Sequence, residues 1–195
     1  MVLAQPELRA EVETGRIAFD PPLEESQWSQ ASVDLRLGFS FTKLKRLPGI
    51  KLSAAQGFRS LAAAGFWDTM ELAERDPLGN RQTFPLAPGE FILGFTYERI
   101  RVPRNLIALV EGRSSYARLG ISMHQTAPWI QPGWEGPIVL EIMNNGPLTV
   151  ELTPLDDKPC QLTFFQLTSE LPPRIAYGAK PGGGFQNQRH PIRPS

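Results

Sequence analysis

Proline and glycine interrupt this chain so often that long regular elements have little room. The 195 residues include 19 prolines and 17 glycines. Proline lacks a backbone N–H and glycine favours turns, so this density favours many short strands joined by turns over a helical bundle. Segments with the apolar pattern and spacing of such strands are 32–38, 85–103, 106–112, 137–144, 148–154 and 160–167. We therefore expect an all-β sandwich or barrel.

Three short helices are also predicted. The first covers residues 6–13, where Pro6 stands at the start and Gly15 can end the helix. The second begins near Ser53, and the third covers residues 114–119 with Gly120 as its stop signal. The length of the chain suits one domain over residues 1–195.

Charge and cysteine content exclude several classes of protein. The 20 Lys and Arg residues balance 20 Asp and Glu residues, which rules out a nucleic-acid binder that works by bulk positive charge. The single cysteine, Cys160, rules out an internal disulfide framework and a zinc site of several thiolates. The longest apolar run, residues 61–67, is far shorter than a membrane span of about 20 residues. The N-terminus has no apolar signal core, so we expect a soluble cytoplasmic protein without nucleic-acid or membrane partners.

The densest polar cluster is the segment EGRSSYARLG, residues 111–120. Arg113, Ser114, Ser115 and Arg118 stand within six positions at the start of the third predicted helix. Two guanidinium groups, two hydroxyls and free helix N–H groups suit an anion, above all a phosphate. The alternative is a capped surface helix in which Arg118 forms a salt bridge.

A second cluster, residues 124–141, opens with one of only two histidines, His124, and ends with Glu141. Glu141 interrupts the apolar segment IVLEIM. A buried carboxylate is costly unless it is paired or functional, and burial suits it to general acid–base chemistry. The alternative is a strand glutamate that faces solvent, and a lone histidine is more typical of a structural role. The sequence lacks the phosphate-loop, dinucleotide-binding and GxSxG motifs. It also lacks the zinc-binding HExxH and zinc-deaminase motifs, so we do not expect zinc chemistry.

These clusters and their order resemble the dCTP deaminases, which share a fold with the trimeric dUTPases. The resemblance covers nearly the whole chain through SQASVDLRLG (29–38), LAPGEFILGFTYERIRVPRNL (86–106), EGRSSYARLG (111–120) and HQTAPWIQPGWEGPIVLEIMN (124–144). The step of 27 residues from Ser114 to Glu141 also matches the family. The resemblance implies a distorted all-β barrel of the dUTPase-like, or β-clip, type with a few short helices. It further implies a homotrimer with active sites between subunits, and a C-terminal arm from about residue 178 to residue 195 that closes over the site.

The implied reaction converts dCTP and water into dUTP and ammonia. Mg²⁺ would be bound through the triphosphate, with no metal ligand from the protein and no zinc. Glu141 would be the catalytic proton shuttle between the attacking water, N3 and the leaving amine. Ser114 and Arg118 would hold the water and the Glu141 carboxylate in position.

Substrate contacts are implied position by position. Side chains would meet the phosphates, and backbone groups would frame the base and the sugar. The implied contacts are Arg113, Ser114, Ser115, Arg118, Thr126, Ala127, Gln131, Val139, Leu140, Gln161, Tyr177, Gln188 and, as a candidate for the arm lysine, Lys180.

Three departures from the family pattern matter. Gln131 stands where the family has an aspartate that contacts the sugar 3′-hydroxyl and, in dUTPases, helps to place the water that attacks phosphorus. Glutamine can hydrogen-bond a hydroxyl but cannot act as an anionic base. Gln125 follows His124 where an apolar residue is common, in a neighbourhood that rearranges when dTTP inhibits, so both residues are regulatory candidates. Gly184 occupies the position of the arm lysine, and Lys180 lies four residues earlier.

The leading hypothesis is a monofunctional dCTP deaminase. A second hypothesis is a bifunctional dCTP deaminase and dUTPase that forms dUMP, and Gln131 counts against it. A pure dUTPase is disfavoured because Glu141 would then have no role. A nucleotide-binding relative without catalysis is the hypothesis from a different class, and it predicts binding without turnover.

Overall fold

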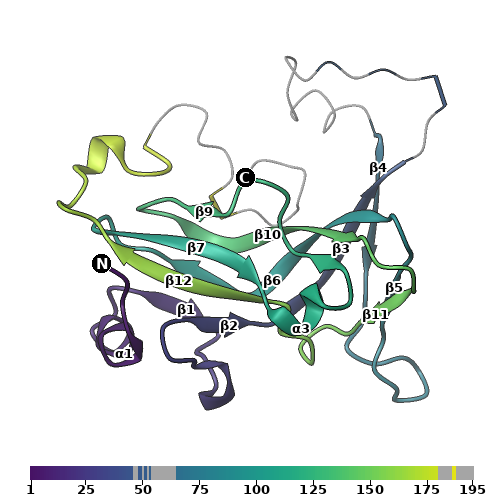
Figure 1. The fold of residues 1–195 in the computed structure, drawn as a ribbon, viewed down its shortest axis with the longest axis horizontal. Helices are drawn as coiled ribbons and strands as arrows, with labels where there is room; N and C mark the ends of the chain where they lie inside the picture. The colour runs from purple at the N-terminus through teal and green to yellow at the C-terminus, as the bar shows by residue number, and fades with distance from the viewer. Residues whose placement is uncertain (46–47, 50, 52, 54–64, 180–185, 188–195) are drawn as a thin grey trace.

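The structure is built mainly from antiparallel strands, with short helices at its margins (Figure 1). A computed structural model describes residues 1–45, 48–49, 51, 53, 65–179 and 186–187. The largest sheet has the order β4 (Trp67–Glu71), β3 (Leu37–Leu44), β6 (Phe91–Arg101), β10 (Glu135–Asn144) and β8 (Ile121–Ser122), and β1 (Ala18–Asp20) also pairs with β6.

A second sheet has the order β2 (Val33–Leu35), β12 (Cys160–Gln166), β7 (Leu106–Gly112) and β9 (Trp129–Ile130). A separate pair joins β5 (Phe84–Leu86) to β11 (Val150–Leu152). The all-β prediction is therefore confirmed. The hydrogen-bonded order does not close on itself among the described strands, so the barrel is open and distorted.

Two of the predicted helices are confirmed. Residues 6–13 lie in α1 (Gln5–Glu13), and the third predicted helix is present as the four-residue α3 (Ser114–Ala117). The helix predicted near Ser53 lies almost entirely outside the described residues. The structure adds two short 3₁₀ helices, η1 (Glu25–Gln27) and η3 (Pro173–Ile175). The strands β1, β4, β8 and β9 were not predicted, because two to five residues are too few for an alternating pattern to stand out.

The strand β10 shows how alternation sets the two faces of the large sheet. Ile138, Leu140 and Ile142 point into the core and are at most 2% exposed. Val139 and Glu141 therefore share the opposite face, where both are half-buried. Because the side chain of Leu140 is fully buried, this residue can offer a ligand only its backbone groups.

A buried ion pair ties the start of β3 to β6. Glu98 is fully buried and accepts hydrogen bonds from Arg36 Nε at 2.6 Å, from the Arg36 backbone N–H at 2.8 Å and from Gln27 Nε2 at 2.9 Å. A buried carboxylate is stable in a fold only when its oxygens are paired in this way. The network holds the η1–β2 segment against the large sheet.

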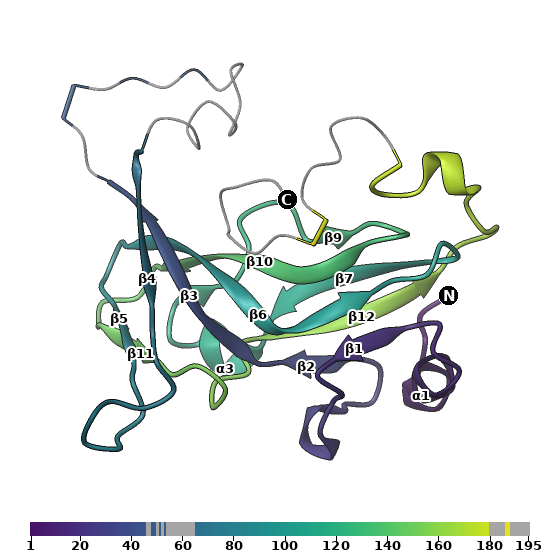
Figure 2. The ribbon, with the colours of Figure 1, turned by 180° about the vertical axis from the view of Figure 1, so that it is seen from behind.

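The short elements lie at opposite ends of the molecule. Figure 2 shows α1 at one end and the β5–β11 pair at the other, with the long strands between them.

The predicted core position of Cys160 is confirmed, since it is fully buried, and burial raises the pKa of its thiol. Among the described residues, no helix has both the length and the apolar character needed to cross a membrane.

Candidate active site

The predicted phosphate cluster lies on α3 and the residues beside it. Ser114, Ser115 and Arg118 are exposed there, as an anion site requires. Arg113 is the N-cap, and its carbonyl accepts hydrogen bonds from the backbone N–H groups of Tyr116 at 3.0 Å and of Ala117 at 3.1 Å. The cluster is therefore presented on a short, regular turn.

Tyr116 fastens α3 to the rest of the fold. Its hydroxyl donates to Asp157 Oδ1 at 2.5 Å. Burial, together with this hydrogen bond, raises the pKa of the Tyr116 hydroxyl above its usual range. Tyr116 therefore stays a neutral donor at physiological pH and anchors the helix through its buried side.

Arg113 points toward a buried acid that the sequence analysis missed. Its Nη1 lies 3.2 Å from Asp34 Oδ2 and donates to the Lys158 carbonyl oxygen at 3.2 Å. Asp34 is only 5% exposed. Burial raises the pKa of the Asp34 carboxyl, and the nearby Arg113 and Lys158 cations oppose part of that rise. The guanidinium of Arg113 remains partly exposed, so it can reach a ligand while it stays paired with Asp34.

The end of α3 is fixed by a close approach of two glycines. Gly120 has φ +85°, and a Cβ there would lie 2.5 Å from the Gly146 nitrogen. The Asn145 N–H donates to the Gly120 carbonyl at 2.8 Å. The turn after β10 thus fixes the turn of residues 118–120 that follows α3. The helix itself ends at Ala117, two residues before the predicted end.

Glu141 is the carboxylate on the exposed side of β10. The backbone N–H of Gln125 donates to Glu141 Oε2 at 3.0 Å, and the Glu141 N–H donates to the Met123 carbonyl at 3.0 Å. No other hydrogen bond or ion pair to its carboxylate is present among the described residues. Glu141 is therefore neither deeply buried nor a free surface residue, and it is partly engaged by the segment that contains His124 and Gln125.

His124 has one charged neighbour. Its Nε2 lies 3.2 Å from Glu111 Oε2, and its buried Nδ1 has no partner among the described residues. Gln161 lies beside Glu111 in the β12–β7 register, and its Oε1 accepts from the Ser32 hydroxyl at 3.0 Å. These side chains form a polar strip where β7 ends and β12 begins, in the middle of the second sheet.

The chain before the C-terminal arm packs against the turn that contains Gln131. Tyr177 and Trp134 have ring centroids 5.0 Å apart, and the Tyr177 N–H donates to the Pro132 carbonyl at 2.9 Å. Further on, Gln186 Nε2 donates to the Gly133 carbonyl at 2.9 Å. Gln131 itself is exposed, as are Thr126 and Ala127. Two predicted arm contacts, Lys180 and Gln188, lie outside the described residues.

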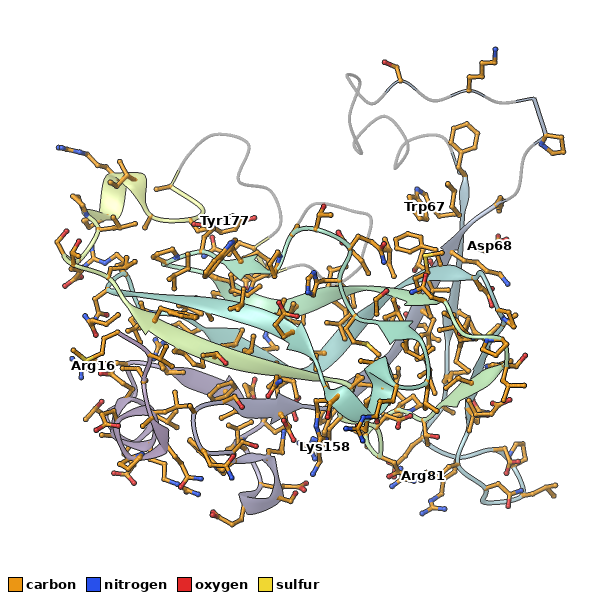
Figure 3. All side chains as sticks on the ribbon, in the orientation of Figure 1. Arg16, Trp67, Asp68, Arg81, Lys158 and Tyr177 are labelled. Atoms are coloured by element: carbon orange, nitrogen blue, oxygen red, sulfur yellow. The ribbon has the colours of Figure 1, made fainter. Side chains whose placement is uncertain are left out.

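One chain does not bring all of the predicted site residues together. Within the described residues, no hydrogen bond or ion pair joins Ser114 or Arg118 to Glu141. Figure 3 shows Lys158, beside the Arg113 end of the cluster, and Tyr177 on opposite sides of the sheets.

A cleft of about 660 Å³ lies apart from these residues. It is lined by the β3–β4 hairpin and the turn before β6. Its two lysines are already paired, Lys43 with Glu90 and Lys45 with Asp68. The described portion of the chain holds no group of three or more His, Cys, Asp and Glu side chains placed to bind a metal ion.

Comparison with known proteins places the chain in a family. A sequence profile of the dCTP deaminase-like family matches residues 2–167. A protein of Methanosphaera stadtmanae named "dCTP deaminase, dUMP-forming" is 38% identical over 91% of this chain and 84% of its own length. A protein of Rhodospirillum rubrum named "dCTP deaminase" is 36% identical over 98% of this chain and 95% of its own length.

A solved structure shares the fold. The crystal structure of 2′-deoxycytidine 5′-triphosphate deaminase from Agrobacterium tumefaciens aligns with a TM-score of 0.62 at 21% identity over 84% of this chain. This chain covers 47% of that one and so spans about half its length. The family profile and the full-length relatives together establish that this chain belongs to the dCTP deaminase-like family.

Proposed function

We propose that this chain is a dCTP deaminase, which converts dCTP and water into dUTP and ammonia. The proposal rests on the burial and hydrogen bonding of the Glu141 carboxylate, in a chain that belongs to this family. Its carboxylate stands half-buried on β10, with one oxygen held by the Gln125 N–H and no other partner among the described residues. A carboxylate in this state can bind a water molecule and exchange protons with it.

Glu141 acts as a proton shuttle in the proposed mechanism. The carboxylate accepts a proton from water as the water oxygen bonds to C4 of cytosine, and it delivers this proton to N3. It then moves the remaining hydroxyl proton to the amine, the C4–N bond breaks, and ammonia leaves as the C4 carbonyl forms. Each proton taken up is returned, so Glu141 is unchanged at the end of the cycle.

The triphosphate would bind around α3. Arg113, Ser114, Ser115 and Arg118 offer two cations and two hydroxyls there. Asp34 is committed to Arg113, so it does not offer a free carboxylate to a metal ion. This donor set fits a Mg²⁺ that is held by phosphate oxygens and water and that neutralises charge on the triphosphate.

We infer that the working enzyme is a homotrimer with shared sites. Two observations support this inference: among the described residues no hydrogen bond or ion pair joins Ser114 or Arg118 to Glu141, and Figure 3 shows Lys158, whose carbonyl accepts from Arg113, away from Tyr177. Neighbouring chains that contribute to one site would bring these groups together. Ser114 and Arg118 of one chain would then hold the water against Glu141 of another. Residues 1–195 would form one domain, with the arm closing from about residue 178.

The remaining contacts are proposed from the resemblance to the family. Base and sugar would be framed by backbone groups and side chains of Thr126, Ala127, Gln131, Val139, Leu140, Gln161, Tyr177 and Gln188. Lys180 is the candidate from the arm for a contact with the triphosphate. The segment with His124 and Gln125 would carry any inhibition by dTTP, because it contacts Glu141 directly. A cytoplasmic location suits an enzyme that uses the nucleotide pool.

A second candidate function is the direct formation of dUMP. It is favoured by the name of the Methanosphaera stadtmanae relative, which is as similar as the relative named dCTP deaminase. Gln131 favours release of dUTP instead, because it cannot act as an anionic base.

Product analysis tests the proposed function. The protein is incubated with dCTP and Mg²⁺, and the nucleotides are separated by ion-exchange chromatography. We expect dUTP and one equivalent of ammonia, without dUMP. A dUMP peak would assign the second function, and retained dCTP with measurable binding would assign a nucleotide-binding relative without catalysis.

A further inference from the structure

Gln125 contacts Glu141 at two separate points. Its backbone N–H donates to the carboxylate Oε2 at 3.0 Å, and its side-chain Nε2 donates to the Glu141 carbonyl oxygen at 3.2 Å. The same Nε2 reaches the Ser122 hydroxyl at 3.4 Å. The side chain thus spans the end of β8 and the middle of β10, while the backbone holds the carboxylate.

Two bonds between the same pair of residues restrain more than either bond does alone. The Nε2 contact fixes the 125 segment to the backbone of β10, and the N–H contact then fixes the rotamer of the glutamate. Gln125 lies on an exposed connection between strands, which the bond from the Glu141 N–H to the Met123 carbonyl already ties to β10. The side chain of Gln125 adds a restraint at the residue whose N–H holds the carboxylate. With Oε2 occupied, the second carboxylate oxygen stays available to a water molecule.

We propose that Gln125 is a positioning residue for Glu141. Its side-chain amide holds its backbone N–H on Glu141 Oε2, and this contact orients the second oxygen toward the attacking water. The inference rests on the proposed role of Glu141. It assigns to Gln125 no contact with substrate, and it predicts an effect on the chemical step rather than on nucleotide binding.

The test compares three exposed-site variants. Gln125→Met keeps the length of the side chain and removes both amide donors. Gln125→Glu keeps the shape but presents an acceptor to the Glu141 carbonyl. Asn145→Ala is the matched control, because Asn145 Nδ2 also reaches the Ser122 hydroxyl at 3.4 Å but makes no bond to Glu141.

The expected result is a split between kcat and KM. Gln125→Met lowers kcat for dCTP roughly tenfold, which corresponds to about 1.4 kcal/mol in the barrier. KM stays within roughly twofold of the wild type, since the lost interaction does not bind the nucleotide. Gln125→Glu lowers kcat by more than Gln125→Met does, and Asn145→Ala keeps the kcat and KM of the wild type. A rise in KM with unchanged kcat, or an equal loss in Asn145→Ala, would overturn the proposal.

Hydrogen–deuterium exchange tests the contact without any activity. The amides of residues 124–127 are followed in the wild type, Gln125→Met and Glu141→Ala. Exchange should be faster in both variants than in the wild type and unchanged in Asn145→Ala. Unchanged exchange in Gln125→Met would refute the positioning role even if the enzyme is active. Full turnover by Glu141→Gln would instead refute the proposed role of Glu141, so the two failures are distinguishable.

Discussion

Replacing Gly120 by alanine should destabilise the protein and displace α3 at the same time. Gly120 has φ +85°, which costs an L-residue about 1–2 kcal/mol. The added Cβ would stand 2.5 Å from the nitrogen and 2.7 Å from the Cα of Gly146, and both are backbone atoms that cannot rotate away. The turn must therefore shift and release the hydrogen bond from the Asn145 N–H to the Gly120 carbonyl. That bond contributes about 1 kcal/mol.

The total loss should be about 3 kcal/mol in the free energy of unfolding, or roughly 6–12 °C in Tm for a chain of this length. Gly79→Ala is a closely matched control, because Gly79 has φ +86° and nothing within 4 Å of its Cβ position. It should lose only the conformational part, about 1–2 kcal/mol. Denaturant unfolding at equal protein concentrations measures both variants, since subunit association adds to apparent stability.

Equal losses in the two glycine variants would refute the reasoning, because they would show that the turn at Gly146 yields without cost. The functional consequence is a second readout. Ser114 and Ser115 lie on α3, Arg118 is its C-cap, and Gly120 closes the turn that follows. Gly120→Ala should therefore also weaken dCTP binding. Gly79→Ala should bind dCTP as the wild type does.

Three further predictions concern buried charge and product choice. Burial raises the pKa of the Asp34 carboxyl in the folded state above its value in the unfolded chain. As pH rises through that raised pKa, the wild type should therefore lose free energy of unfolding relative to Asp34→Asn. Unfolding measured from acidic to neutral pH checks this, and the same pH dependence of stability in both proteins would contradict it. Glu98→Gln should cost about 3 kcal/mol in denaturant unfolding, because it leaves the largely buried guanidinium of Arg36 paired only with the exposed Glu24. Glu74→Gln, at an exposed pair, should cost less than about 1 kcal/mol. Gln131→Asp should add dUMP to the products of dCTP in chromatography, and unchanged products would show that Gln131 does not control the outcome.

The sequence predicts the elements of this fold better than its long-range contacts. Alternation identified β7 to the residue. The polar cluster correctly placed the start of α3 at Ser114, although the helix ends at Ala117 rather than at Leu119. Alternation along residues 32–38 predicts that Asp34 lies on the opposite face from Val33 and Leu35, yet Asp34 is also buried. Period-two patterns report which residues share a face, but they do not report whether another segment covers that face.

The contacts of the candidate site show the same limit. The pair of Gln125 and Glu141 forms because the chain after β8 continues beside β10, and no local pattern predicts that pairing. The pairing of Arg113 with Asp34 likewise joins residues that are far apart in the chain. The resemblance to the family identified the candidate site residues, but their hydrogen-bond partners are seen only in the folded structure.

The central claim is that Glu141 carries the proton transfers of dCTP deamination. The most direct test is Glu141→Gln, which keeps the shape and removes the base, with binding of dCTP measured beside dUTP formation. The account predicts that dCTP binding is retained and that deamination falls by at least about 100-fold. Deamination by the variant at the wild-type rate would contradict the account, because another group would then have to move the protons.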